Sequence, residues 1–218
     1  MKITKFGHCC LLIEEKGLQI LTDPGTYTDA QNEIKNIDVI LITHEHQDHF
    51  HVPSVKKILI NNPGAVIITN SAVNDLLKKE GIISAKVVED GEDLNVKDIL
   101  FEAFGEKHAV VYKEIGQVEN TGYFIGEKLF YPGDAYTIPE RGSKRNVEIL
   151  AAPFAGPWVK ISEAIEYVLA VKPKKCFPVH DGGLNDGGAG FSRTVAPKIF
   201  SVEGIEFVPI EINKETEF

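Results

Sequence analysis

The sequence predicts an α/β domain, and three observations support that prediction. Short apolar runs bounded by turn residues, such as Asp38–Thr43, have the length and composition of buried strands. Between them lie segments with helical caps and stops, such as Ser71–Glu80. The 218 residues, 43% of them hydrophobic, are enough for one well-buried domain and short for two. We therefore expect a single domain over residues 1–218.

Strands are expected wherever a short apolar run lies between turn residues. Turns at Gly7-His8 and Lys16-Gly17 separate the first three, and a hairpin is expected about Gly126-Glu127. The predicted strands are Ile3–Phe6, Cys9–Ile13, Leu18–Thr22, Asp38–Thr43, Ala65–Thr69, Lys86–Glu89, Ile99–Phe104, Gly122–Ile125, Lys128–Tyr131, Ile149–Ala152, Lys175–Val179 and Ile205–Pro209.

Four helices are expected from caps, stops and periodic apolar residues. Ser71 and Ser162 are the candidate caps of two of them, and Gly81 is a stop. Pro53 fits the first turn of the first helix, whereas Pro197 weakens the prediction of the last. The predicted helices are Pro53–Ile60, Ser71–Glu80, Ser162–Val171 and Ser192–Phe200.

The densest chemical feature is the segment His44-Glu45-His46-Gln47-Asp48-His49, which follows the predicted strand Asp38–Thr43. It packs four potential metal ligands into six residues, enough to supply two metals. Imidazole and carboxylate donors suit zinc, iron, nickel or manganese, and the absence of thiolate favours a catalytic over a purely structural site. Further ligands are expected at other strand ends, where site residues collect. His108, Asp134 and His180 each follow such an apolar run.

Each of these three residues has a structural alternative when taken alone. A single histidine at a strand end is more often a hydrogen-bonded structural residue, and Asp134 after Pro-Gly suits a turn. Taken together, five of the seven histidines and two aspartates follow one another at predicted strand ends. The set therefore predicts a metal centre.

The order His-x-His-x-Asp-His, then His, then Gly-Asp, then His resembles the metallo-β-lactamase superfamily. The resemblance implies a four-layer αββα sandwich with a dinuclear centre. It implies that one metal is bound by His44, His46 and His108, that the second is bound by Asp48, His49 and His180, and that Asp134 bridges them. The opening of the chain, Ile3–Glu14 followed by Ile20–Pro24, resembles the L-ascorbate-6-phosphate lactonase-like branch.

A centre of this kind implies a metal-dependent hydrolase. Two divalent ions, zinc first and manganese, nickel or iron as alternatives, would hold a hydroxide that cleaves a small ester, lactone, thioester or phosphoester. Asp48 is expected to orient this nucleophile as well as bind metal. A ribonuclease or phosphodiesterase is one alternative. A diiron redox protein is another, which His46 disfavours because such members usually carry a carboxylate there.

Charge and composition exclude other classes. The net charge of −9 argues against nucleic-acid binding, which usually needs a basic face. No apolar run approaches the roughly 20 residues that span a bilayer, and the N-terminus lacks the apolar core of a signal peptide. Three cysteines do not form a disulfide framework. We expect a cytoplasmic protein with a small-molecule substrate, and a homo-oligomer is compatible with the sequence.

Substrate contacts are predicted outside the metal ligands. His8 at its turn and Trp158, the only tryptophan, are the candidates, although a turn residue and a packed core residue are the plainer alternatives. The basic group Arg141, Lys144 and Arg145 would suit an anionic substrate, but a solvated loop is favoured. Gly182–Gly190 lacks the Lys-Ser/Thr of a P-loop, so we predict a mobile flap there.

Overall fold

The computed structural model describes the backbone of residues 1–218 and all side chains except those of Asp186, Phe191 and Ser192. Its first sheet contains, in spatial order, β16 (Glu215–Glu217), β1 (Lys2–Gly7), β2 (Cys10–Glu15), β3 (Leu18–Thr22), β4 (Val39–Leu41), β5 (Val66–Thr69) and β6 (Lys86–Val87). The second contains β15 (Glu206–Phe207), β14 (Lys175–Val179), β13 (Ile149–Pro153), β10 (Leu129–Tyr131), β9 (Gly122–Ile125), β8 (Ile99–Phe104) and β7 (Asp93–Val96). A separate small hairpin joins β11 (Glu140–Arg141) to β12 (Ser143–Lys144).

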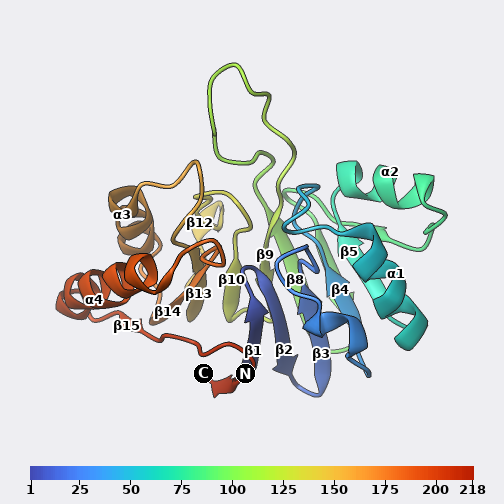
Figure 1. Cartoon of the computed structure of the whole chain (residues 1–218), viewed down its shortest axis with the longest axis horizontal. Coiled ribbons are helices and arrows are strands. Elements are labelled where there is room, and N and C mark those ends of the chain that lie inside the picture. Colours follow the sequence, from blue (N-terminus) through green and yellow to red (C-terminus); the bar gives the residue numbers. More distant parts are fainter.

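The helices are the 3-10 turn η1 (Ala30–Glu33), α1 (Val52–Asn61), α2 (Ser71–Lys79), α3 (Ile161–Val171) and α4 (Asp186–Val202). Figure 1 shows α1 and α2 on one side of the molecule, α3 and α4 on the other, and the two sheets between them. This is the predicted αββα sandwich, and the fold prediction is confirmed. No helix in the part of the chain that the structure describes is both long and apolar enough to cross a membrane.

Strand alternation divides the core into three apolar clusters. Cys9, Ile20 and Phe101 belong to the cluster between the two sheets. Cys10 and Ile40 point from the first sheet to α1 and α2. Phe130 and Cys176 point from the second sheet to α3 and α4. The adjacent cysteines therefore fill two different layers, and both are buried.

The strand directions gather the candidate residues at one edge of the sandwich. Strands β3, β4 and β5 are parallel in the first sheet, as are β10, β13 and β14 in the second. The predicted hairpin of β9 and β10 is confirmed. Because parallel strands end at the same edge of a sheet, the loops after β4, β10 and β14 come together there.

The caps of α2 and α3 and the start of α4 differ from the sequence prediction. Helix α2 is capped by Asn70, whose side chain accepts from the Val73 N–H, and not by Ser71. Helix α3 begins at Ile161 without a side-chain cap, so Ser162 is not its cap. The predicted flap Gly182–Gly190 is wrong in its second half, because α4 already begins at Asp186. Asn185 caps that helix and accepts from the Gly188 N–H at 2.9 Å.

Candidate metal centre

Four loops at one edge of the sandwich carry the seven predicted ligands. His44, His46, Asp48 and His49 lie between β4 and α1, His108 follows β8, Asp134 follows β10 and His180 follows β14. All are buried except Asp48 and His46, which are partly exposed. The structure brings all seven side chains together.

The first group joins two of these loops. His44, His46 and His108 each offer a ring nitrogen, and these nitrogens lie within 4.8 Å of one another. The Nε2 atom of His44 lies 3.2 Å from the Nδ1 atom of His46. Three converging imidazoles form a donor set that suits one divalent ion.

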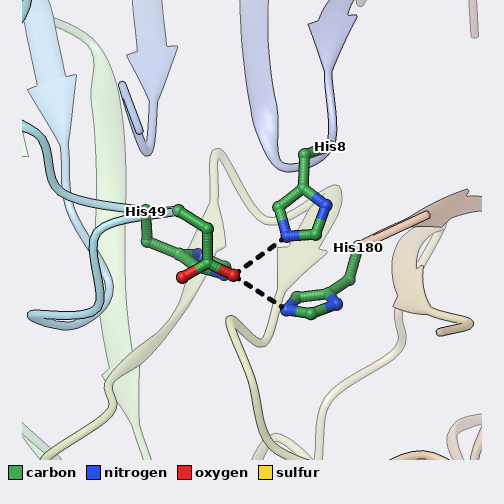
Figure 2. Close-up of side chains that lie close together, drawn as sticks. His8, His49 and His180 are labelled. Atoms are coloured by element: carbon green, nitrogen blue, oxygen red, sulfur yellow. Dashed lines mark hydrogen bonds and ion pairs between the residues drawn. The ribbon is translucent and has the colours of Figure 1, made fainter. Parts of the chain in front are cut away.

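The second group lies beside the first. Asp48, His49 and His180 place donor atoms within 4.8 Å of one another, together with His8. Figure 2 shows the rings of His8 and His180 directed at one carboxylate oxygen, which is Oδ2 of Asp48 at 3.2 and 3.5 Å. A carboxylate and two or three imidazoles again match the donors of a divalent ion.

Asp134 lies between the two groups. Its Oδ2 atom is 3.3 Å from His108 Nε2 and 2.8 Å from His180 Nε2, and its Oδ1 atom is 3.1 Å from His49 Nε2. The His49 Nε2 and Asp134 Oδ1 atoms are buried, face each other at 3.1 Å and have no other hydrogen-bond partner among the residues that the structure describes. Buried polar atoms that lack well-formed hydrogen bonds fit a site that binds a cation.

Asp23 orients the His49 ring, on the ring nitrogen that faces away from Asp134, and the sequence did not identify this residue. Its carboxylate is fully buried, and its Oδ2 atom lies 2.7 Å from His49 Nδ1. The same oxygen accepts from the Tyr131 hydroxyl at 2.6 Å and from the Thr43 hydroxyl at 2.8 Å. The only signal was the Thr22-Asp23-Pro24 segment at the end of β3, which carries no metal-ligand pattern of its own.

Other ligand rings are held in the same way. The Nδ1 atom of His108 donates to the Ala109 carbonyl at 2.5 Å, and that of His44 lies 3.0 Å from the Thr43 hydroxyl. With Nδ1 engaged in this way, the Nε2 atoms of His44, His49 and His108 are free to bind a cation. Such outer contacts fix both the tautomer and the ring orientation of metal-binding histidines.

The charges in the centre are strongly coupled. Burial opposes ionisation of Asp134, but the surrounding histidines hold the pKa of its carboxyl well below the usual range. Burial likewise opposes the charge on His180, but the hydrogen bonds that its ring donates to Asp134 and Asp48 outweigh burial and raise the pKa of His180 to about 11. Burial lowers the pKa of His44. In the metal-free protein the negative charge of Asp134 is therefore balanced by protons on neighbouring imidazoles.

The two candidate substrate residues adjoin the centre. His8 is 3% exposed, and its Nδ1 atom accepts from the Gly182 N–H at 3.2 Å. Its Nε2–H therefore donates to Asp48, which assigns His8 a positioning contact in addition to its place near the site. Trp158 lines a cavity at the centre and packs edge-on against His108 and His180 at ring-centroid distances of 5.7 and 5.8 Å.

The basic group does not reach the centre. Arg141 pairs with Asp93 at 2.6 Å and Arg145 with Glu102 at 2.5 Å. Lys144 donates to the Ala170 carbonyl. Acidic and carbonyl groups already occupy these residues at the surface, which agrees with the favoured prediction of a solvated loop and not with the anion-binding alternative.

Comparisons with known proteins agree with this fold. The sequence profile described as the beta-lactamase superfamily domain matches residues 2–180. Protein Rv0786c of Mycobacterium tuberculosis is 36% identical over 83% of this chain and 84% of its own. A UPF0173 metal-dependent hydrolase of Carboxydothermus hydrogenoformans is 27% identical over 83% of this chain and 84% of its own.

Among solved structures, Igni18, a metallo hydrolase from Ignicoccus hospitalis, is similar with a TM-score of 0.75. It is 19% identical, and the match covers 100% of this chain and 98% of that one. At this identity the likeness concerns the fold. Its agreement with the two-sheet architecture is independent of the sequence pattern that predicted the sandwich.

Proposed function

The chain belongs to the β-lactamase superfamily, and we propose that this metal-dependent hydrolase uses two divalent metal ions to cleave a small ester, lactone, thioester or phosphoester. The observation that carries the proposal is the position of Asp134. Its two carboxylate oxygens face histidines of both ligand groups, at 3.1 Å from His49 and 3.3 Å from His108. A bridging carboxylate is what a pair of ions needs to lie close together.

The ligands are assigned as follows. His44, His46 and His108 would hold one ion, Asp48, His49 and His180 the other, and Asp134 both. When bound, two divalent ions lower the pKa of a water so that hydroxide is available near neutral pH. We propose zinc as the ion, with manganese, nickel or iron as alternatives for the same donors.

Asp48 has a second role in this proposal. Its Oδ2 atom accepts from His8 and faces His180, and its side chain is 27% exposed at the cavity, more than the other carboxylate of the centre. Because His8 holds this Asp48 oxygen on one side, the oxygen has a fixed orientation on its other side. Asp48 is therefore proposed to position the attacking nucleophile as well as to bind metal.

Finer assignments also belong to this proposal. The Gly7-His8 turn and the Thr22-Asp23-Pro24 segment support a place near the L-ascorbate-6-phosphate lactonase-like branch. His46, an imidazole at the position where diiron members usually carry a carboxylate, supports hydrolysis over redox chemistry. The acidic net charge of −9 supports a small-molecule substrate over RNA. A cytoplasmic location and a homo-oligomeric state remain predictions.

The test is hydrolysis by protein that has been stripped of metal and reloaded. Zinc-loaded protein is expected to cleave p-nitrophenyl esters or lactones, and chelation is expected to abolish cleavage. Asp134→Ala is expected to lower the rate at least about 100-fold, since removing the bridge disturbs both ions. His51→Ala is the matched control, because the His51 ring contacts Ser54 and lies outside both groups. Cleavage that survives chelation, or Asp134→Ala with normal activity, would contradict the proposal.

A further inference from the structure

Two cavities adjoin the candidate ligands. One of about 190 Å³ and one of about 270 Å³ share Asp48, Pro157 and His180 in their walls. Since both reach Asp48, a molecule bound at the metals would extend into them. Their walls beyond the metal ligands therefore determine which substituents a substrate can carry.

Those walls are mostly apolar. Val111, Pro157 and Trp158 line the smaller cavity, and Tyr27, Ala155 and Leu184 line part of the larger. Trp158 is 8% exposed and is fixed by edge-on contacts with His108, His180 and Tyr136. An indole held this rigidly offers a flat apolar surface at little entropic cost.

The same walls lack positive side chains. Of the residues whose side chains the structure describes, no lysine or arginine lines either cavity. Lys5, which is buried on β1, is paired with Asp181, the residue after His180. The N-terminal turn of α4 is capped by Asn185. A phosphate or carboxylate on a substrate is usually held by an arginine or a lysine, so such a group would have no cationic side chain to pair with here away from the metals.

We propose that the substrate carries an uncharged, apolar substituent, alkyl or aryl, beside the bond that is cleaved. This inference rests on the proposed hydrolase function and deepens it. The substituent lies against Trp158, Pro157 and Val111. Phosphorylated and carboxylated substituents at that place are discriminated against, because no lysine or arginine among the described side chains lines the cavity walls to pair with them.

A neighbouring surface extends this apolar wall. Val111 belongs to the segment between β8 and β9, which rises as the green loop at the top of Figure 1. Its neighbours Val110 and Tyr112 are 56% and 57% exposed. The apolar surface thus continues from the cavity onto the loop, which suits a substituent longer than the cavity itself.

The test uses hydroxamates, which share a metal-binding head group, and isothermal titration calorimetry of the zinc-loaded protein. Hexanohydroxamate is expected to bind at least tenfold more tightly than acetohydroxamate, because two or three methylene groups become buried. The six-carbon monohydroxamate of adipic acid, which ends in a carboxylate, is expected to bind at least tenfold more weakly than hexanohydroxamate.

Variants of the cavity wall show where the hydroxamate chain binds. Trp158→Ala is expected to remove most of the gain with chain length. Ile115→Ala, on the β8–β9 loop that carries Val111 but outside both cavities, is expected to leave it unchanged. Val111→Arg adds a positive charge to the wall and is expected to reverse the preference in favour of the carboxylate-ended compound. Equal affinities, a wild-type preference for the carboxylate, or no binding by any of the three would overturn the inference.

The outcomes separate this inference from the function it rests on. If the hydrolase proposal alone fails, the protein still binds the three hydroxamates in the expected order but does not cleave p-nitrophenyl hexanoate in a metal-dependent way. Failure of the present inference would give metal-dependent cleavage that is equally fast with apolar and carboxylated esters.

Discussion

His49 and His180 face the same carboxylate, that of Asp134, from loops on different sheets, but they are held in different ways. The His49 ring is fully buried, and its Nδ1 atom is 2.7 Å from Asp23, which Tyr131 and Thr43 hold in turn. The Nδ1 atom of His180 is buried without a hydrogen-bond partner, and the residue has a left-handed backbone with φ 58°. One ligand is fixed through its ring, the other through its backbone.

The backbone around His180 is fixed by β1 and the turn that follows it. Its N–H donates to the His8 carbonyl at 3.3 Å. One residue on, Asp181 pairs with the buried Lys5, which also donates to the Pro178 carbonyl at 2.8 Å. His49 is thus held through its ring by Asp23 of the same sheet, to which Tyr131 adds a hydrogen bond from the second sheet, whereas the His180 loop of the second sheet is supported by the N-terminal strand. Each kind of support makes a different prediction.

The largest effect is expected from Asp23. Asp23→Asn replaces a carboxylate that accepts four hydrogen bonds with an amide that turns an N–H toward one of its donors, the His49 ring. We expect zinc affinity at the Asp48-His49-His180 group to fall about 10- to 100-fold, the usual cost of losing an outer carboxylate. Competition with a chromophoric chelator measures it. Asp38→Asn is the control, because Asp38 precedes β4, at the end away from the metal centre, and pairs with Lys97. It should leave zinc affinity unchanged. Equal affinity in both variants would mean that Asp23 does not support His49 as described.

A smaller effect is expected from Lys5. Lys5→Met breaks a buried ion pair and leaves Asp181 without its partner, which we expect to lower the free energy of unfolding by about 3 kcal/mol. Lys2→Met, on the same strand, breaks an exposed pair with Glu215 and is expected to leave the free energy of unfolding nearly unchanged. Urea denaturation of the metal-free protein measures both. A difference below about 1 kcal/mol would mean that β1 does not support the His180 loop as described.

The smallest expected effect is the release of protons when the metal ions bind. Burial opposes a charge on both rings, but Asp134 outweighs it at His49 and raises the pKa of that ring. Asp134 and Asp48 together raise the pKa of His180 to about 11. Both imidazoles therefore hold protons at pH 7.5 in the metal-free protein. Metal binding requires neutral imidazole. We therefore expect at least about two protons to be released as the ions bind, so affinity falls as pH falls. Calorimetry in buffers of different ionisation enthalpy counts them, and release of fewer than one would contradict these charge states.

The sequence predicted the residues that carry chemistry better than those that support them. His44, Asp134 and His180 are recognisable because their residue types and positions after apolar runs have a meaning of their own. Asp23 does not, since its role arises only when β3, β4 and β10 bring Thr43, His49 and Tyr131 to one carboxylate.

Two further differences between the sequence prediction and the structure also arise from tertiary contacts. Lys5 is 2% exposed, although an isolated lysine in a strand is expected at the surface. Helix α4 begins within a glycine-rich stretch because Asn185 caps it, and Ala196 and Phe200 bury its inner face against the second sheet. Tertiary contacts outweigh the low helix propensity of glycine in that segment.

The most direct test of the central claim is the number and position of bound metals. Metal analysis of protein purified without added metal, together with anomalous diffraction from its crystals, is expected to give about two equivalents and two peaks roughly 3.5–4 Å apart, with Asp134 between them. A single peak away from Asp134, or no metal even after reconstitution, would contradict the account.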